Sequence, residues 1–196
     1  MQVVVAEVSR VAGLVLAAGA GRRFGGPKAV AELAGERLVD RALRVLVQGG
    51  TFPAYVVSGA VELDVPGAVV VPNPAWAEGM GSSLRAGLAA MPEDVDAALV
   101  VLVDQPGLTA EAVARLVAVA DGPGSLAVAT YEGRQGHPVV LGRTWWPEVA
   151  ELAVGDAGAR EVLRRHEDGL VRIECGDVAT DSDVDREEDL RRLTEP

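Results

Sequence analysis

Short apolar runs alternate with amphipathic stretches along most of this chain. Continuous apolar runs cover residues 11–18 and 97–103, and shorter runs cover 54–57, 68–71 and 126–130. An uninterrupted apolar run of this length is typical of a strand that is buried on both faces of a parallel sheet. The pattern therefore predicts five buried strands, separated by segments of a different periodicity.

Helices are predicted between these strands, where apolar positions recur every three or four residues. Residues 36–47 place a set of apolar side chains on one helical face: Leu38, Val39, Ala42, Leu43 and Leu46. Ser82 or Ser83 is expected to cap a helix that runs to residue 90. Three further helices are predicted at residues 109–121, 156–166 and 186–193.

The second half of the chain adds a hairpin turn at 131–137, a returning strand at 138–141 and a late strand at 170–174. Strands that alternate with helices favour a mostly parallel sheet with helices on both faces. We therefore predict a three-layer α/β/α fold with a doubly wound sheet. No internal repeat, low-complexity segment or long linker divides the sequence, so residues 1–196 are expected to form one domain.

Composition narrows the class of protein. The chain has 196 residues, of which 49% are hydrophobic and 24% are charged, as expected for a globular protein and not for a disordered one. Its 18 basic and 29 acidic side chains give a net charge of −11. Such a charge disfavours a general binder of nucleic acid or anionic membranes. An anionic substrate is still compatible, because it needs only a local cluster of positive charge.

The chain has one cysteine, Cys175, and two histidines, His137 and His166. An internal disulfide is therefore impossible, and a Cys-rich or His-rich metal site is excluded. The first ten residues contain Glu7 and lack the pattern of a secretory leader. No apolar stretch reaches the roughly 18 residues of a membrane span. We expect a cytoplasmic protein, with Cys175 and His166 in structural roles.

The loop after the first predicted strand concentrates glycine and positive charge. Four glycines fall within residues 19–26, and the same loop carries Arg22, Arg23 and Lys28, the only lysine of the chain. Glycine lets the backbone approach a ligand closely and exposes N–H groups to phosphate oxygens. The loop therefore indicates a phosphate site, and the alternative is a basic turn exposed to solvent.

Two common phosphate motifs do not match this loop. Pro27 follows Gly26 where a Walker A motif has a lysine. Phe24 occupies the position of the third glycine in a dinucleotide fingerprint. A nicotinamide-dependent oxidoreductase is therefore disfavoured.

Asp104 ends the clearest strand pattern of the chain, the seven apolar residues 97–103. Ligands bind at the carboxyl ends of the strands in open parallel sheets. Mg²⁺ prefers oxygen ligands from one or two carboxylates together with phosphates. Asp104 is thus a candidate metal ligand, although Gln105-Pro106-Gly107 after it is equally compatible with a simple turn.

Five motifs follow one another along the chain: Leu16 to Gly25 with Pro27-Lys28, Asn73 to Leu84, Asp104-Gln105-Pro106, Gly136-His137-Pro138, and Gly155 to Arg160. In this order they resemble the molybdenum cofactor cytidylyltransferases, within the MobA-like NTP transferase family. The resemblance extends over about residues 11–190. It implies a Rossmann-like nucleotidyltransferase sheet, with an NTP-binding part at about 11–108 and an acceptor-binding part at about 109–196.

The resemblance implies Mg²⁺-dependent transfer of CMP from CTP to the phosphate of molybdopterin, with release of pyrophosphate. The attacking phosphate is already anionic, so catalysis needs positioning and electrostatic stabilisation instead of a general base. By this resemblance Arg23 neutralises the β,γ-phosphates and Lys28 contacts the α-phosphate. Asp104 and Asp185 are the implied metal ligands. Arg186-Glu187 replaces the family's Thr-Pro after Asp185, which is alternatively a helix cap facing Glu188.

The same resemblance assigns two binding sites. The NTP site comprises Leu16, Ala17, Ala18, Gly19, Gly21, Arg22, Arg23, Lys28, Gly79, Ser82 and Ser83. The acceptor site comprises Gln105, Pro106, Gly136, His137, Pro138, Asp156 and Arg160. Ala18 favours cytosine, because guanylyltransferase relatives carry a glycine at this position. Trp76 either stacks on the nucleotide or belongs to the core.

Two other functions remain open. One is a nucleotidyltransferase of the same fold that uses GTP or a sugar phosphate. The other is a non-catalytic nucleotide-binding accessory protein of a molybdoenzyme, which would then be its partner. The joint presence of Arg23, Lys28 and Asp104 disfavours the accessory role, because a protein that only binds nucleotide does not need the full set.

Overall fold

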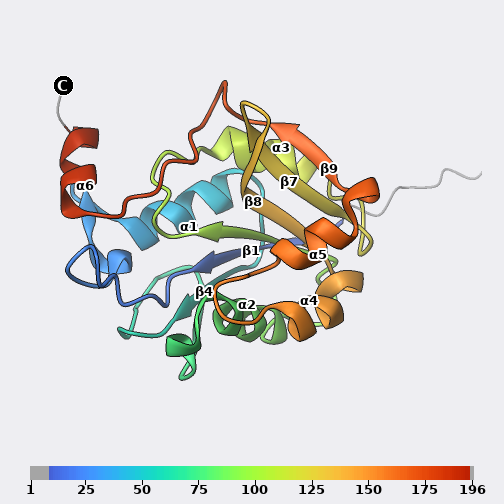
Figure 1. Cartoon of the computed structure of the whole chain (residues 1–196), viewed down its shortest axis with the longest axis horizontal. Coiled ribbons are helices and arrows are strands. Elements are labelled where there is room, and N and C mark those ends of the chain that lie inside the picture. The colour runs from blue at the N-terminus through green and yellow to red at the C-terminus, as the bar shows by residue number, and fades with distance from the viewer. Residues whose placement is uncertain (1–8, 195–196) are drawn as a thin grey trace, which may run out of the picture.

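The computed structural model describes residues 9–194 and has three layers, with a central sheet between two layers of helices (Figure 1). The sheet contains seven strands: β1 (Val11–Leu16), β4 (Ala54–Ser58), β5 (Val69–Pro72), β6 (Ala97–Leu102), β7 (Leu126–Tyr131), β8 (Arg134–Gly142) and β9 (Val171–Glu174). Their order is β5-β4-β1-β6-β8-β7-β9. Strand β8 runs antiparallel to β6 and β7, and every other neighbouring pair is parallel. The predicted mostly parallel sheet is confirmed.

Helices cover both faces of this sheet. Helices α1 (Leu38–Gln48) and α3 (Ala110–Ala118) pack on one face, and α2 (Met80–Ala89), α4 (Trp146–Leu152) and α5 (Arg160–Arg165) pack on the other (Figure 1). Successive side chains of a strand point to opposite faces, so Val15 joins the core under α1 while Leu14 joins the core under α2. Burial on both faces explains why the central strands are uniformly apolar.

Three of the predicted helix starts are wrong, and two of them lie in the first half of the chain. Residues Glu36–Arg37 form strand β3, which pairs with β2 (Glu32–Leu33) in a small hairpin, so α1 begins only at Leu38. Ser82 and Ser83 do not cap α2. Both serines lie buried inside the helix, and Gly79 is its N-cap, with a φ of +110° that only glycine adopts readily.

The α4–α5 region also differs from the prediction. The seven-residue helix α4 was missed, because so few residues show no clear helical periodicity. The helix predicted at 156–166 shortens to α5, since Gly158 has a positive φ of +53° just before it. The helix predicted at 109–121 forms as α3, and Thr109 is its N-cap: the Thr109 hydroxyl accepts a hydrogen bond from the Ala112 N–H at 3.2 Å.

The remaining elements are short. Four 3₁₀ turns lie at Lys28–Val30, Trp76–Glu78, Arg143–Trp145 and Glu167–Gly169. Helix α6 (Glu187–Thr194) ends the described chain, close to its predicted limits. The expectation that the chain has no secretory leader rests on its first ten residues, of which only residues 9 and 10 belong to the described part. Within residues 9–194, no helix is both long and apolar enough to cross a membrane.

The direction of the strands positions the candidate site. Strands β1 and β6 are parallel neighbours, with Leu16 opposite Leu102, so the loops that follow them leave the sheet at the same edge. Helix α6 lies beside the first loop, as the red helix next to the blue loop in Figure 1 shows. Three segments that are far apart in sequence therefore meet at this carboxyl edge.

Candidate active site

The ammonium group of Lys28 lies between two carboxylates at this edge. Its Nζ donates to Asp104 Oδ2 at 2.8 Å and to Asp185 Oδ1 at 3.1 Å. Burial lowers the pKa of Lys28, but the hydrogen bonds and charges of Asp104 and Asp185 outweigh burial and keep the pKa above its ordinary value. The side chain is thus a fixed cation at the end of β6.

The second sequence hypothesis for Asp185, a helix cap, does not describe its side chain. The carboxylate of Asp189 accepts hydrogen bonds from the N–H groups of Asp185 at 3.0 Å and Arg186 at 2.8 Å. The backbone at the start of α6 is therefore satisfied from within the helix. The carboxylate of Asp185 is left to face Lys28.

Asp104 and Asp185 fit a divalent cation. Both carboxylates contact the same Lys28 nitrogen, so they converge on one position that already holds a positive charge. Residues 9–194 contain no cluster of three or more potential protein ligands for a metal. Two carboxylates completed by phosphate oxygens and water are a coordination set that suits Mg²⁺ or Mn²⁺.

A cavity of about 460 Å³ opens next to this cluster. Most of the predicted NTP-site residues line it: Leu16, Ala18, Gly19, Gly21, Arg22, Arg23, Lys28, Gly79 and Ser83. Ala17 and Ser82 do not line the cavity. Ala17 is buried in the core under α1, and Ser82 belongs to a buried hydrogen-bond network. The wall also contains Trp76 and Met80; Trp76 packs at the same time against the core.

The cavity has two walls of different character. The first loop contributes Arg22, Arg23 and Lys28, which are all cationic. The segment 76–83 contributes Trp76, Ala77, Gly79, Met80 and Ser83, none of which is charged. The cationic wall suits phosphate groups, and the uncharged wall suits a ring with a few polar atoms.

Several arginines in the cavity walls have no partner within the described part of the protein, which indicates that the site binds an anionic ligand. Within residues 9–194, the arginines whose side chains form no hydrogen bond or ion pair are Arg22, Arg23, Arg160 and Arg186. Three of these four line a cavity. In a chain with a net charge of −11, guanidinium groups left unpaired in cavity walls are available to bind an external anion.

A second cavity, of about 360 Å³, adjoins the first. Its floor is apolar and includes Val100, Val128, Val139 and Leu141 from the sheet. The polar side chains in its wall are Gln105, Gln135, His137, Asp156, Arg160, Asp181 and Asp183. An apolar floor with polar edges fits a flat heterocycle.

Only some of the acceptor-site residues that were expected from the sequence line the second cavity. Gln105, Gly136, His137, Asp156 and Arg160 line the second cavity, whereas Pro106 and Pro138 do not. Pro106 faces α1 instead: its carbonyl oxygen accepts a hydrogen bond from Arg41 Nε at 2.9 Å. Pro138 is buried within β8. Sequence reasoning missed Gln135, Asp181 and Asp183, although the last two lie in the acidic segment that contains Asp185.

Burial shifts the pKa of two titratable groups in the second cavity in the direction of the neutral form. Burial of the ring lowers the pKa of His137 to about 4, and the charge of Arg160 acts in the same direction against that of Asp104. Burial and the charge of Asp104 raise the pKa of Asp183, whose carboxylate accepts a hydrogen bond from Gln105 Nε2 at 3.0 Å. His137 is therefore a neutral hydrogen-bonding group near pH 7 and not a charged one.

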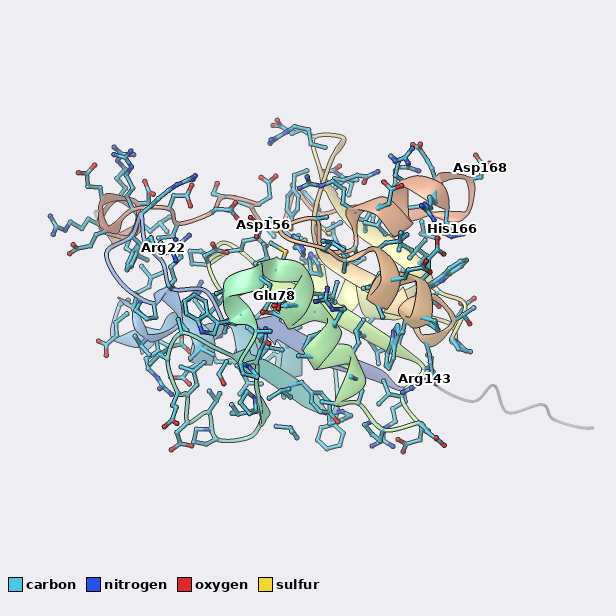
Figure 2. The ribbon with its side chains drawn as sticks, turned by 60° about the horizontal axis from the view of Figure 1, so that its bottom comes forward. Arg22, Glu78, Arg143, Asp156, His166 and Asp168 are labelled. Carbon is cyan, nitrogen blue, oxygen red and sulfur yellow. The ribbon has the colours of Figure 1, made fainter. Side chains whose placement is uncertain are left out.

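Asp156 lies where the two cavities meet and lines both. Its Oδ1 accepts a hydrogen bond from the Met80 N–H at 3.3 Å, and the Gly81 N–H donates to the Gly155 carbonyl at 2.8 Å. Figure 2 shows Asp156 beside the start of α2, with Glu78 close by and Arg22 on the first loop. The segment before α5 thus separates two adjoining compartments.

Comparisons with known proteins agree with this arrangement. The family model described as the MobA-like NTP transferase domain matches residues 13–170. The chain is 41% identical over 198 residues to the nicotine blue oxidoreductase of Paenarthrobacter nicotinovorans, covering 93% of this chain and 96% of that protein. It is 36% identical over 176 residues to a molybdenum cofactor guanylyltransferase of Rhizobium johnstonii, covering 88% and 80% respectively.

The chain is also similar over its whole fold to proteins of solved structure. Rv0371c from Mycobacterium tuberculosis H37Rv superposes with a TM-score of 0.78 at 27% identity, covering 96% of this chain and all of that one (100%). A complex of Rv0371c with manganese superposes with a TM-score of 0.72 at 26% identity, covering 94% and 98%. A divalent metal has therefore been observed with a protein of this architecture.

Proposed function

The chain belongs to the MobA-like NTP transferase family, and within that family we propose that it transfers CMP from CTP to the phosphate of a molybdopterin-type acceptor. Nucleotidyltransferase activity follows from the family, whereas the choice of nucleotide and acceptor is specific to this proposal. The observation that carries it is the cluster of Lys28, Asp104 and Asp185 where two cavities with unpaired arginines adjoin.

The donor is proposed to bind in the first cavity. Arg22 and Arg23 bind the β,γ-phosphates, and the uncharged wall at 76–83 receives the base. Asp104 and Asp185 hold Mg²⁺, which supplies positive charge to the phosphates when it is bound. Lys28 then leaves the two carboxylates and contacts the α-phosphate, where negative charge accumulates during transfer.

The reaction needs no proton transfer by the protein. An oxygen of the acceptor phosphate forms a bond to the α-phosphorus, and the bond from that phosphorus to the bridging oxygen breaks. The electron pair stays on the departing pyrophosphate. The contribution of the chain is to bring two anions together, so positioning and charge compensation dominate.

The acceptor is proposed to bind in the second cavity. Its apolar floor and polar edges suit the flat ring system of a pterin, and Arg160 is free to pair with an anionic group. The relative named molybdenum cofactor guanylyltransferase supports a molybdenum-related acceptor. Ala18 lines the first cavity and, by the resemblance stated above, favours cytosine over guanine. A cytoplasmic location and a molybdoenzyme partner belong to the same proposal.

A second candidate is an oxidoreductase activity. The 41% identity to the protein named nicotine blue oxidoreductase, over 93% of this chain, favours it. Phe24 disfavours it, because this bulky residue replaces a glycine of the usual dinucleotide fingerprint. A nucleotidyltransferase consumes an NTP and releases pyrophosphate, whereas an oxidoreductase of this kind consumes a reduced nicotinamide cofactor, so one assay separates the two candidates.

The test measures pyrophosphate release from each of the four NTPs, with and without molybdopterin, and in parallel the absorbance of NADH and NADPH in the presence of a quinone-type dye as electron acceptor. The expected result is release from CTP only when molybdopterin and Mg²⁺ are both present. Asp104→Asn is the matched control, and it should lose release while keeping its fold. Release from GTP alone overturns the choice of base. Oxidation of a nicotinamide cofactor without pyrophosphate release overturns the proposal itself.

A further inference from the structure

Asn73, the only asparagine of the chain, is the centre of a buried hydrogen-bond network behind the uncharged wall of the first cavity. Its Nδ2 donates to Ser82 Oγ at 2.9 Å and to Ser83 Oγ at 3.1 Å. Its Oδ1 accepts from the Ala75 N–H at 3.0 Å. Asn73 itself is 4% exposed and does not line either cavity.

The orientation of the Asn73 amide is determined by its neighbours. A backbone N–H can only donate, so the atom that faces Ala75 must be the oxygen. The amide nitrogen consequently faces Ser82 and Ser83, and each of its two hydrogens has one serine oxygen as acceptor. Both serines are therefore acceptors toward Asn73.

The two serine hydroxyls differ in where their own hydrogen goes. Ser82 Oγ lies 2.9 Å from the carbonyl oxygens of both Ala75 and Gly79, so its hydrogen is used within the protein. For Ser83, the part of the chain from residue 9 to 194 offers the hydroxyl hydrogen no acceptor. Ser83 lines the first cavity, so this hydrogen is available to a ligand there.

We propose that Asn73 is a positioning residue that fixes Ser83 as a hydrogen-bond donor toward the nucleobase in the first cavity. This inference rests on the proposed nucleotide site. The amide occupies a lone pair of Ser83 Oγ and leaves the hydrogen for an acceptor atom of the base, such as a ring carbonyl oxygen or an unprotonated ring nitrogen. Asn73 thus acts on nucleotide selection without touching the nucleotide.

The base is the relevant part of the ligand because of where Ser83 lies. Trp76, Ala77 and Met80 share its wall and carry no charge, whereas the cations that suit phosphates come from the first loop. A donor in the uncharged wall adds affinity for the base and none for a bare phosphate chain. This difference provides the test.

The experiment compares the dissociation constants of CTP and of inorganic tripolyphosphate by calorimetry, with Mg²⁺ present. Ser83→Ala removes the donor directly. Asn73→Asp keeps an acceptor for the Ala75 N–H but accepts from both serines, so the Ser83 hydrogen turns inward. Each variant is expected to weaken CTP binding about three- to tenfold, the effect of one neutral hydrogen bond, and to leave tripolyphosphate binding unchanged.

Ser125→Ala is the matched control. Ser125 is also buried, its hydroxyl donates to Asp121 Oδ1 at 3.0 Å, and it lines neither cavity. It should leave both dissociation constants unchanged. If Asn73→Asp does not fold, Asn73→Ala replaces it, with a smaller loss for CTP because the Ser83 hydroxyl then turns freely.

The possible failures are distinguishable. If the wild-type protein does not bind CTP, the proposed nucleotide site is contradicted, whether or not the protein binds tripolyphosphate. Wild-type protein that binds CTP, with Ser83→Ala binding it equally well, overturns the inference while leaving the nucleotide site intact. Equal weakening of CTP and tripolyphosphate also overturns it, because a merely structural role predicts that pattern.

Discussion

Lys28 has two roles that cannot be fulfilled in one position. In the structure its ammonium group pairs with both Asp104 and Asp185 and offsets part of their negative charge. In the proposed reaction the same two carboxylates bind a divalent metal, and Lys28 contacts the α-phosphate. The lysine therefore stands where the metal has to bind, and the two cations compete for the same pair of carboxylates.

Replacing Lys28 with methionine should separate these roles. Without the ammonium group the carboxylates keep their full negative charge, so Mn²⁺ should bind the nucleotide-free protein more tightly, on the order of tenfold. Turnover should nevertheless fall about 10²–10³-fold, because a preorganised charge is lost from the reacting phosphate. Electron paramagnetic resonance measures free Mn²⁺, and pyrophosphate release measures turnover.

Lys28→Arg is the control, since it keeps a cation near the two carboxylates. Its Mn²⁺ affinity should stay close to that of the wild type. Unchanged or weaker Mn²⁺ binding in Lys28→Met would show that the carboxylates do not share a metal position.

At the scale of elements, the start of α2 is joined to the segment before α5 through a glycine. Gly79 has a φ of +110°, and a Cβ there would lie 2.6 Å from the Gly155 carbonyl carbon and 2.7 Å from Asp156 Oδ1. These contacts separate the two cavities. Any residue other than glycine at position 79 would therefore require the segment around Gly155 and Asp156 to move.

Gly79→Ala should destabilise the protein by more than backbone strain alone, which is about 1–3 kcal/mol. Gly67→Ala isolates the strain, because Gly67 has a φ of +89° with no atom within 4 Å of an added Cβ. Urea unfolding measures both losses. Equal losses in the two variants would mean that the α2 junction relaxes at no cost.

A second element-scale contact holds the turn between β7 and β8. The carboxylate of Glu174, at the end of β9, accepts hydrogen bonds from Thr130 Oγ1 at 2.9 Å and from the N–H groups of Glu132 and Gly176 at 3.0 Å each. The Thr130 hydrogen bond, followed by these backbone donors, lowers the pKa of Glu174 below its ordinary value of 4.5. The ionised carboxylate is thus the form that stabilises the turn.

The sign of the pH dependence follows from this lowered pKa. Because the folded pKa lies below the unfolded one, the stabilisation is fully present above pH 4.5 or so and is lost as the pH falls through the folded pKa. Glu174→Gln cannot ionise and should lose stability at neutral pH but show a flatter decline in acid. Thermal unfolding from pH 7 to pH 3 tests this, and parallel curves for the two proteins would refute it.

At the scale of the whole molecule, both cavities contain arginines that are not paired within the described part of the protein. Arg22 and Arg23 belong to the first loop, and Arg160 begins α5 on the other side of Asp156. Most other arginines of the described chain are paired with carboxylates or carbonyl oxygens. Three of the four unpaired arginines of residues 9–194 therefore lie where the two proposed anionic substrates would have to meet.

Arg23→Ala and Arg160→Ala should therefore each weaken the binding of a different substrate. Arg23→Ala is expected to weaken CTP binding and leave the KM of the acceptor unchanged, whereas Arg160→Ala is expected to raise the acceptor KM and leave CTP binding unchanged. Each loss should be about tenfold or more, as for a hydrogen bond to a charged group. Calorimetry and steady-state kinetics provide the two measurements. Variants that weaken both substrates alike would show that the cavities do not act separately.

The sequence by itself determined the features that depend on local pattern. Uniform apolar runs indicate the buried strands. The glycines and the sole lysine of the first loop indicate a phosphate site. Asp104 was identifiable because a carboxylate follows seven apolar residues. The α/β class, the mostly parallel sheet and most strand positions could be predicted in this way. The short helix α4 could not, because its seven residues carry no distinct period.

Only the tertiary structure decided which distant residues share a site. Asp185 lies 157 positions from Lys28 and reaches it because α6, which follows Asp185, packs against β2, the strand that follows Lys28. Gln105 and Pro106 are adjacent in the turn after β6, yet only Gln105 reaches the second cavity, while the Pro106 carbonyl accepts a hydrogen bond from Arg41 on α1. Asn73 bonds to Ser82 and Ser83 because a turn folds it under the start of α2. These contacts depend on strand order and helix packing, which local sequence pattern does not contain.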